Sequence, residues 1–189
     1  GFRGSSTNIT ENRRAEDALR ESERQFRVLA ANVAGGLLYM DEEARYVFVN
    51  KAYASWFGLE SEEFVGNTAL EVLGQDVDDN SREYFLTALG GEKVTYEAVR
   101  QTTVSGPKDI QVTNVPNIAA DGTVEGVFVL VTDVSEIRLR ERALEESHKL
   151  LQALIDGMPE FIALKDAQGK YLFVNRVFEE WYGRPRDQV

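Results

Sequence analysis

The sequence predicts an α+β fold in which a five-stranded antiparallel sheet carries several short helices on one face. The main evidence is a repeated phrase. Residues 46–58 combine a short apolar strand, Asn50 and an aromatic helix, and residues 171–183 repeat this pattern, so that Asn175 stands 125 positions after Asn50. The second observation is the order of elements after residue 36, which is two strands, several short helical segments and three strands. A single antiparallel sheet closes this order with short connections.

The first half of the predicted domain is a hairpin followed by helical segments. Two apolar strands, at residues 37–40 and 45–50, are joined by a polar turn that lacks the usual glycine. Residues 51–57 form a helix that Gly58 ends. The remaining expected segments are single helical turns at 61–64 and 68–73, an acidic loop at 76–80 and a helix at 81–89.

Three longer strands are expected in the second half, at residues 93–103, 109–118 and 124–134. Short turns that contain Gly106 and Gly122 separate them. Residues 127–131 are continuously apolar, which predicts that the last strand is central and covered on both faces.

The flanks divide the chain into further predicted segments. Residues 1–11 are interpreted as the tail of a preceding copy, ending in a strand without its sheet, and residues 156–189 as the first part of a following copy. Both end pieces are expected to be disordered unless another chain packs on them. A complete domain is predicted at residues 30–136, between connector helices at 12–29 and 137–155.

The second connector carries a seven-residue apolar spacing, at Ile137, Leu144 and Leu151. Such a narrow stripe is typical of paired helices, so we expect a homodimer through the connectors. The alternative is a solvated spacer helix.

Composition excludes several classes of function. The chain of 189 residues has no cysteine and a net charge of −11. The absence of cysteine and of an apolar run long enough to span a membrane leads us to expect a cytoplasmic location. Because the chain is acidic and has no basic patch, we expect no nucleic-acid binding. Residues 76–80 begin like a calcium loop but lack its glycine and glutamate, so no metal site is expected. We find no catalytic constellation.

Candidate site residues come from the helix after the hairpin and from the strand faces. Asn50 and Asn175 are interpreted as helix caps, with a ligand contact as the alternative. Tyr53, Trp56 and Phe57 share a helix face, which indicates core packing or contact with a bound small molecule.

Two polar residues occur at strand positions that otherwise carry apolar side chains. Arg100 follows Val94, Tyr96 and Ala98 at alternate positions, and Asn114 follows Ile110 and Val112. A buried guanidinium needs an anionic partner, so Arg100 is the best candidate for a polar ligand contact. The alternative is that Arg100 lies near the strand end and reaches water.

Asp133 and Glu136 stand where the last strand meets the connector helix. Asp133 is expected to cap this helix or to pair with a basic residue, and so to relay a change in the sheet.

These features together resemble the PAS sensory-domain family. The resemblance rests on the order of elements, on Val49-Asn50 before the aromatic helix, and on three further phrases: residues 61–66, residues 89–92 and Thr132-Asp133-Val134-Ser135-Glu136. It implies a sensor module of a bacterial signalling protein, upstream of a histidine kinase or a diguanylate cyclase. The alternative is a ligand-free spacer that only dimerises and relays.

The resemblance also bears on cofactors. Covalent flavin chemistry in this family needs a cysteine, which is absent, and histidine-ligated haem needs a histidine inside the domain, whereas His148 lies in the connector. Non-covalent flavin, a small acid or no ligand remain open, so the cofactor is unknown.

Overall fold

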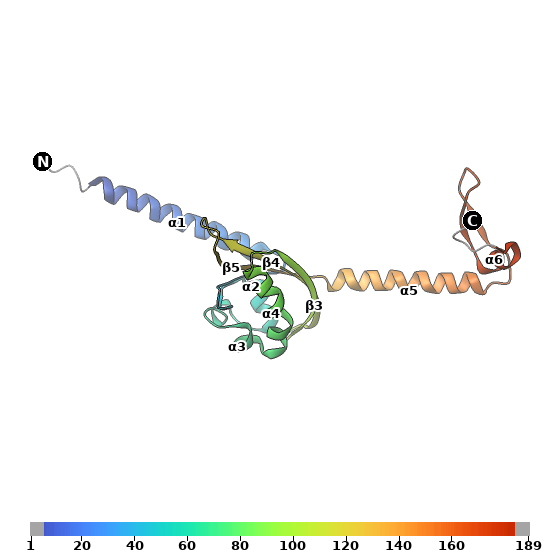
Figure 1. Ribbon diagram of the computed structural model, residues 1–189, viewed down its shortest axis with the longest axis horizontal. Coiled ribbons are helices and arrows are strands. Elements are labelled where there is room, and N and C mark those ends of the chain that lie inside the picture. The colour runs from blue at the N-terminus through green and yellow to red at the C-terminus, as the bar shows by residue number, and fades with distance from the viewer. Residues whose placement is uncertain (1–5, 184–189) are drawn as a thin grey trace. The chain divides into compact units, whose positions relative to one another are not determined.

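The computed structural model describes residues 6–183, apart from the side chains of residues 6–12, 15, 16, 19, 76, 78 and 80 (Figure 1). Its elements, in chain order, are α1 (Ser6–Asn32), β1 (Gly36–Met40), β2 (Tyr46–Val49), α2 (Lys51–Phe57), the 3-10 turn η1 (Ser61–Glu63), α3 (Ala69–Leu73), α4 (Gln75–Leu89), β3 (Val94–Thr102), β4 (Gly106–Ile118), β5 (Val124–Asp133), α5 (Ser135–Gly157), β6 (Ala163–Lys165), β7 (Tyr171–Val174) and α6 (Arg176–Tyr182).

Five strands form one antiparallel sheet in the spatial order β2-β1-β5-β4-β3. This arrangement confirms the predicted fold class and the central position of β5. The helices α2, α3 and α4 lie on one side of the sheet (Figure 1), and α4 contacts β3, β4 and β5. The core between these layers is built from alternate residues of each strand, as a half-buried sheet requires.

The prediction that β5 is covered on both faces is wrong within the part of the chain that is described. Val127, Val129 and Val131 face the helices and are buried. Phe128 and Leu130 point to the other face, where they are 37% and 39% exposed. A continuous apolar run therefore does not show that both faces of a strand are buried.

Two local boundaries differ from the sequence prediction. Residues 76–80 belong to α4, which begins at Gln75, so the expected acidic loop is wrong. Gly74 adopts φ 90°, which lets the chain turn directly from α3 into α4. The strand β4 begins at Gly106 rather than at residue 109, and the connection before it is correspondingly tighter.

The flanking segments also depart from expectation. Residues 6–11 are the start of α1 rather than a strand, and residues 1–5 lie outside the described residues. At the other end β6 and β7 pair and α6 follows them within this chain, so the expected disorder is wrong for this piece up to residue 183. The chain divides into two compact units at Ser135. No helix within the described residues is long and apolar enough to cross a membrane.

Candidate functional site

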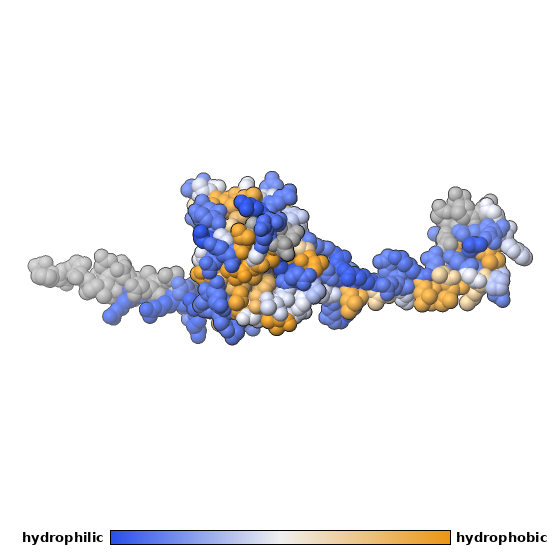
Figure 2. All heavy atoms as spheres, turned by 90° about the horizontal axis from the view of Figure 1, so that it is seen from below, coloured by the Kyte–Doolittle hydropathy of each residue, from blue (hydrophilic) through white to orange (hydrophobic). Residues whose placement is uncertain are grey.

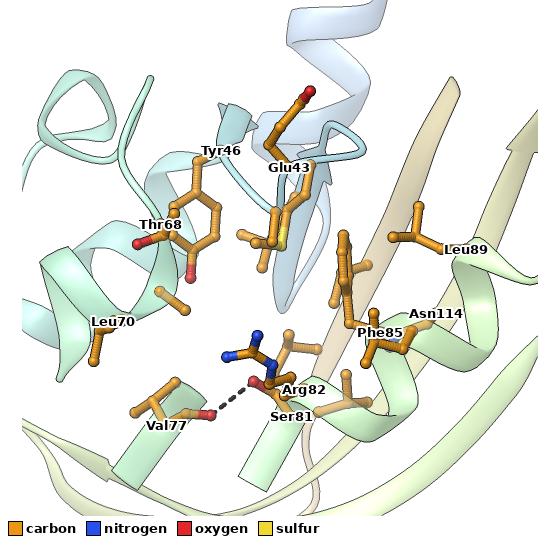
Figure 3. Close-up of a pocket in the computed structure, with 18 of the residues that line it drawn as sticks. Glu43, Tyr46, Thr68, Leu70, Val77, Ser81, Arg82, Phe85, Leu89 and Asn114 are labelled. Atoms are coloured by element: carbon orange, nitrogen blue, oxygen red, sulfur yellow. Dashed lines mark hydrogen bonds between the residues drawn. The ribbon is translucent and has the colours of Figure 1, made fainter. Parts of the chain in front are cut away.

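A cavity of about 330 Å³ lies between the sheet and the helices α3 and α4. Its wall is mostly apolar, with Leu38 and Met40 from β1, Val112 from β4 and Phe85 from α4. Tyr46, Thr68 and Leu70 stand on one side and Phe85, Leu89 and Asn114 on the other (Figure 3). The volume falls at the lower end of the range of about 300–1,000 Å³ that small-molecule pockets occupy.

Two buried polar side chains line this cavity without satisfying their hydrogen-bonding groups. Arg100 is 6% exposed and its Nε has no hydrogen-bond partner among the described residues; Asn114 is 2% exposed and its Oδ1 likewise has none. The alternative in which Arg100 reaches water is therefore wrong. Unsatisfied buried polar atoms are uncommon, and a functional role is one of their recurrent explanations.

Arg100 lies beside a second cation whose charge is neutralised. The two strands β3 and β4 place Arg100 directly opposite Lys108. Lys108 donates from Nζ to Oδ2 of Asp133 at 2.5 Å, whereas no ion pair between Arg100 and a described carboxylate is present. The positive charge inside the domain is thus compensated at Lys108 but not, within the described residues, at Arg100.

Two tyrosines close to Arg100 stay neutral over the physiological range. Burial raises the pKa of Tyr53, against an opposing effect of the Arg100 charge. Burial likewise raises the pKa of Tyr96 to about 12. The Tyr96 ring stacks on Tyr84 of α4 with centroids 3.8 Å apart. Neither phenol therefore becomes an anion that neutralises Arg100.

The predicted ligand-contact residues divide into two groups. Tyr53, Arg100 and Asn114 line the cavity. Phe57 instead packs edge-on against Tyr53 in the core, and the Trp56 ring lies under Nζ of Lys108, 5.2 Å from it. Neither Trp56 nor Phe57 lines the cavity.

Most residues of the cavity wall were not predicted from the sequence as ligand contacts. The missed residues are the inward-facing ones of β1 and β5, those of α4, and the mouth residues Glu42, Glu43, Leu70, Arg82 and Leu86. The alternation of apolar residues on the strands marks the inner sheet face, but it does not show which part of that face lines an open space.

Asn50 and Asn175 cap helices as predicted, and each makes further bonds. Oδ1 of Asn50 accepts from the Tyr53 N–H at 3.2 Å and from the Leu37 N–H at 3.0 Å. Its Nδ2 donates to the carbonyls of Ala30 and Gly35. One side chain therefore joins the end of α1, the start of β1 and the start of α2.

The junction between β5 and α5 is a second connected cluster. Asp133 accepts the Ser135 N–H through Oδ1 and Lys108 through Oδ2. Burial alone would raise the pKa of Asp133, but the hydrogen bonds from Lys108 and Ser135 hold it below its usual value. Oγ of Ser135 also accepts the Asp109 N–H at 3.0 Å. Glu136 is highly exposed and pairs with Arg140, one turn further along α5.

Comparison with protein families identifies the fold. A family described as the PAS fold matches residues 30–139, and one described as the PAS domain matches residues 149–189. The chain belongs to the PAS family. No curated protein matches the chain.

Solved structures with similar folds include PAS domains and receptors. VqmA of Vibrio cholerae in a ligand–DNA complex superposes with a TM-score of 0.52 at 18% identity, over 57% of this chain and 49% of its own. The PAS domain of Bordetella pertussis BvgS gives 0.50 at 23% identity, over 70% of this chain and 98% of its own. An RNA-binding light-oxygen-voltage receptor gives a TM-score of 0.54 at 18% identity, over 81% of this chain and 42% of its own. The chain spans about half the length of the VqmA chains that it resembles.

Proposed function

We propose that residues 30–136 form the sensor of a cytoplasmic bacterial signalling protein, which binds a small molecule in the cavity and regulates a downstream histidine kinase. The observation that carries this proposal is the cavity itself, which is enclosed by the PAS sheet and α4 and holds unsatisfied groups of Arg100 and Asn114. A purely structural core gains nothing from such groups, because each costs about 1–3 kcal/mol when it lacks a partner.

One of the similar structures, which was solved with a ligand, supports ligand binding on this fold. VqmA has been solved bound to DPO, and its structure superposes on this chain with a TM-score of 0.52. At 18% identity the likeness concerns the fold alone. The ligand of this PAS domain is therefore inferred from the residues of its own cavity.

A short series of contacts supports a relay from the cavity to α5. The rings of Tyr53, which lines the cavity, and Trp56 are 5.6 Å apart, and Trp56 lies under Lys108. Lys108 in turn holds Asp133, whose Oδ1 accepts the N–H of Ser135, the first residue of α5. A ligand that moves Tyr53 thereby alters the start of the connector helix.

The connector supports the dimeric part of the proposal. Ile137, Leu144 and Leu151 are 56%, 61% and 54% exposed on α5, although apolar side chains of this size are favoured in contacts. Apolar groups separated by hydrophilic ones are visible along α5 in Figure 2. We propose that two copies of α5 pair along this seam, and that the ligand changes how they pair.

The experiment uses a spin label on α5, which the absence of native cysteine makes site-specific. The Glu146→Cys variant, in which the label lies on the exposed face about 180° around α5 from Ile137, is labelled, and distances between the two copies are measured by pulsed electron spin resonance. Filling the cavity with Val112→Phe should shift the distance distribution, as a permanently bound ligand would. The spacer alternative expects no shift, and an unchanged distribution in a verified dimer would reject the sensor.

A diguanylate cyclase in place of the kinase is the second candidate for the regulated domain. The proposed change in helix pairing does not depend on which of the two enzymes is regulated, so the cavity and the relay fit either one. Output assays of the full-length protein, by autophosphorylation and by cyclic di-GMP formation, distinguish the two.

A further inference from the structure

The chemistry around Arg100 specifies the class of ligand, if the cavity binds one as proposed above. An ionised side chain that is 6% exposed needs a compensating charge, because a low-dielectric surrounding disfavours an isolated ion. The described residues supply no carboxylate to Arg100, and the adjacent carboxylate of Asp133 is already bonded to Lys108 and Ser135. The partner that Arg100 lacks among the described residues must therefore carry a negative charge.

We propose that the ligand is a small organic monocarboxylate, whose acid group is bound by Arg100 and whose opposite end donates a hydrogen bond to Asn114. The free Nε of Arg100 is the donor that, with one terminal N–H, binds both oxygens of a carboxylate side-on. Asn114 presents a free acceptor, Oδ1, which is complementary to a hydroxyl, amide or ring N–H.

The shape of the site favours an elongated ligand with an apolar body. Arg100 is opposite Lys108, and Asn114 lies six residues further along β4. At a rise of about 3.3 Å per residue, the two Cα positions are about 20 Å apart along the strand, and the long arginine side chain spans part of this distance. Between them the cavity wall is apolar, with Tyr96 and Val112 on the sheet and Phe85 opposite.

Charge favours a monoanion over a phosphate dianion. Arg100 is the single buried cation among the described residues that line the cavity, so it compensates one negative charge. The mouth carries two exposed carboxylates, Glu42 and Glu43, and one exposed cation, Arg82. This arrangement adds no further positive charge for a second negative group.

The high pKa values of the nearby phenols remove the internal alternative. Tyr53 and Tyr96 remain protonated at neutral pH, so they act as hydrogen-bond donors to an anion and not as anions themselves.

The test uses matched acids and amides. Calorimetry measures the binding of 4-hydroxyphenylacetate, 3-(4-hydroxyphenyl)propanoate and their primary amides to the whole chain. Each acid carries a carboxylate and a distal hydroxyl, and each amide differs only in the charge. We expect the acids to bind at least about tenfold more tightly than the amides, and Arg100→Gln to remove this difference. The variant Asn114→Val should weaken the acids while preserving their advantage over the amides.

Thermal unfolding without ligand provides a second test, which does not depend on ligand binding by the variants. Without ligand, Arg100→Gln should raise the thermal unfolding temperature, because it removes a buried charge that has no compensating partner among the described side chains. Equal binding of acids and amides would overturn the anionic ligand while leaving a small-molecule sensor. Failure of both series to bind would overturn this inference too, and the spin-label experiment on Val112→Phe then decides separately whether the cavity takes part in signalling.

Discussion

The side chains of Asn50 and Asn175 make the same set of hydrogen bonds to partners that are themselves 125 positions apart. The Nδ2 group of Asn175 donates to the carbonyls of Ile155 and Glu160, and Oδ1 accepts from the N–H groups of Ile162 and Phe178. Each partner is the counterpart of one bound by Asn50. The repeat in the sequence is thus a repeat of a hydrogen-bonded junction between an incoming helix and a PAS core.

Removal of this junction should destabilise the first PAS domain. We expect Asn50→Ala to lower the free energy of unfolding by about 2–4 kcal/mol, because the helix cap and the buried bonds to Ala30, Gly35 and Leu37 are lost together. Urea denaturation measures this change. The control Thr68→Ala removes an exposed cap of α3 and should cost about 1 kcal/mol. An equal cost for both variants would show that the bonds of Asn50 to the α1 end contribute little.

Enlarging a side chain that lines the cavity should lower the free energy of unfolding less than enlarging one in the packed core. Val112 and Val127 are 2% and 0% exposed, but only Val112 lines the cavity. We expect Val112→Phe to change the free energy of unfolding by less than about 1 kcal/mol, whereas Val127→Phe should cost about 1–3 kcal/mol through overpacking. Thermal and urea unfolding of the two variants test this order. Equal destabilisation would mean that the space next to Val112 is not open in solution.

The stability of the β5–α5 junction should depend on pH in a defined direction. The pKa of Asp133 in the folded protein lies below its ordinary value of 3.8. Its contribution is therefore present at neutral pH and is lost as pH falls below about 4, through the folded-state pKa. We expect Asp133→Asn to cost about 1–2 kcal/mol at pH 7 and progressively less in more acidic solution, as measured by urea unfolding between pH 7 and pH 3.

A second acidic residue provides the control for this experiment. Hydrogen bonds from Thr123 lower the pKa of Asp121, which lies in the exposed turn before β5, at the other end of this strand from Asp133. Hydrogen exchange of the first α5 amides should increase in Asp133→Asn and stay unchanged in Asp121→Asn. Increased exchange in both would indicate a general loss of stability rather than a loosened helix start.

The seam on α5 should control self-association. We expect Leu144→Glu to weaken the proposed dimer at least about tenfold, because it places a charge at the centre of the apolar stripe. Leu139 is 67% exposed and lies about 200° around the helix from Ile137, so Leu139→Glu should leave association unchanged. Sedimentation equilibrium measures both. Loss of the dimer in Leu139→Glu alone would place the contact on the other face of the helix.

The sheet was predictable because its strands are continuous apolar runs or alternate apolar and polar residues, and because glycine or polar residues mark the turns. The turn between β1 and β2 lacks the usual glycine, and other residues of the turn take its place. Ala44 adopts φ 60°, at the position where the second copy has Gly169. Oδ1 of Asp41 accepts the N–H groups of Glu43 and Arg45, which holds this turn without glycine.

The site was only partly predictable for a reason of packing. The helix α2 places Tyr53 towards the cavity. Trp56 follows three residues later, so its direction differs by about 60° and its ring lies at Lys108 instead. The cavity itself depends on how closely Phe85 and Leu89 of α4 approach the sheet. Such a distance is the sum of many side-chain volumes, which no single motif encodes. The charge of Arg100 was recognisable because it interrupts an apolar alternation on β3.

The bond from Asn50 to the carbonyl of Ala30 also bears on how PAS units are exchanged between proteins. Because the final turn of each incoming helix is tied to the unit that follows, a recombinant hybrid spliced at that turn would separate an amide from its acceptor. Crossovers placed in the middle of α5 avoid this loss, and insertions or deletions there in multiples of seven residues keep the apolar stripe in phase. Fusion libraries that vary the crossover position along α5 should therefore yield regulated hybrids with a seven-residue periodicity.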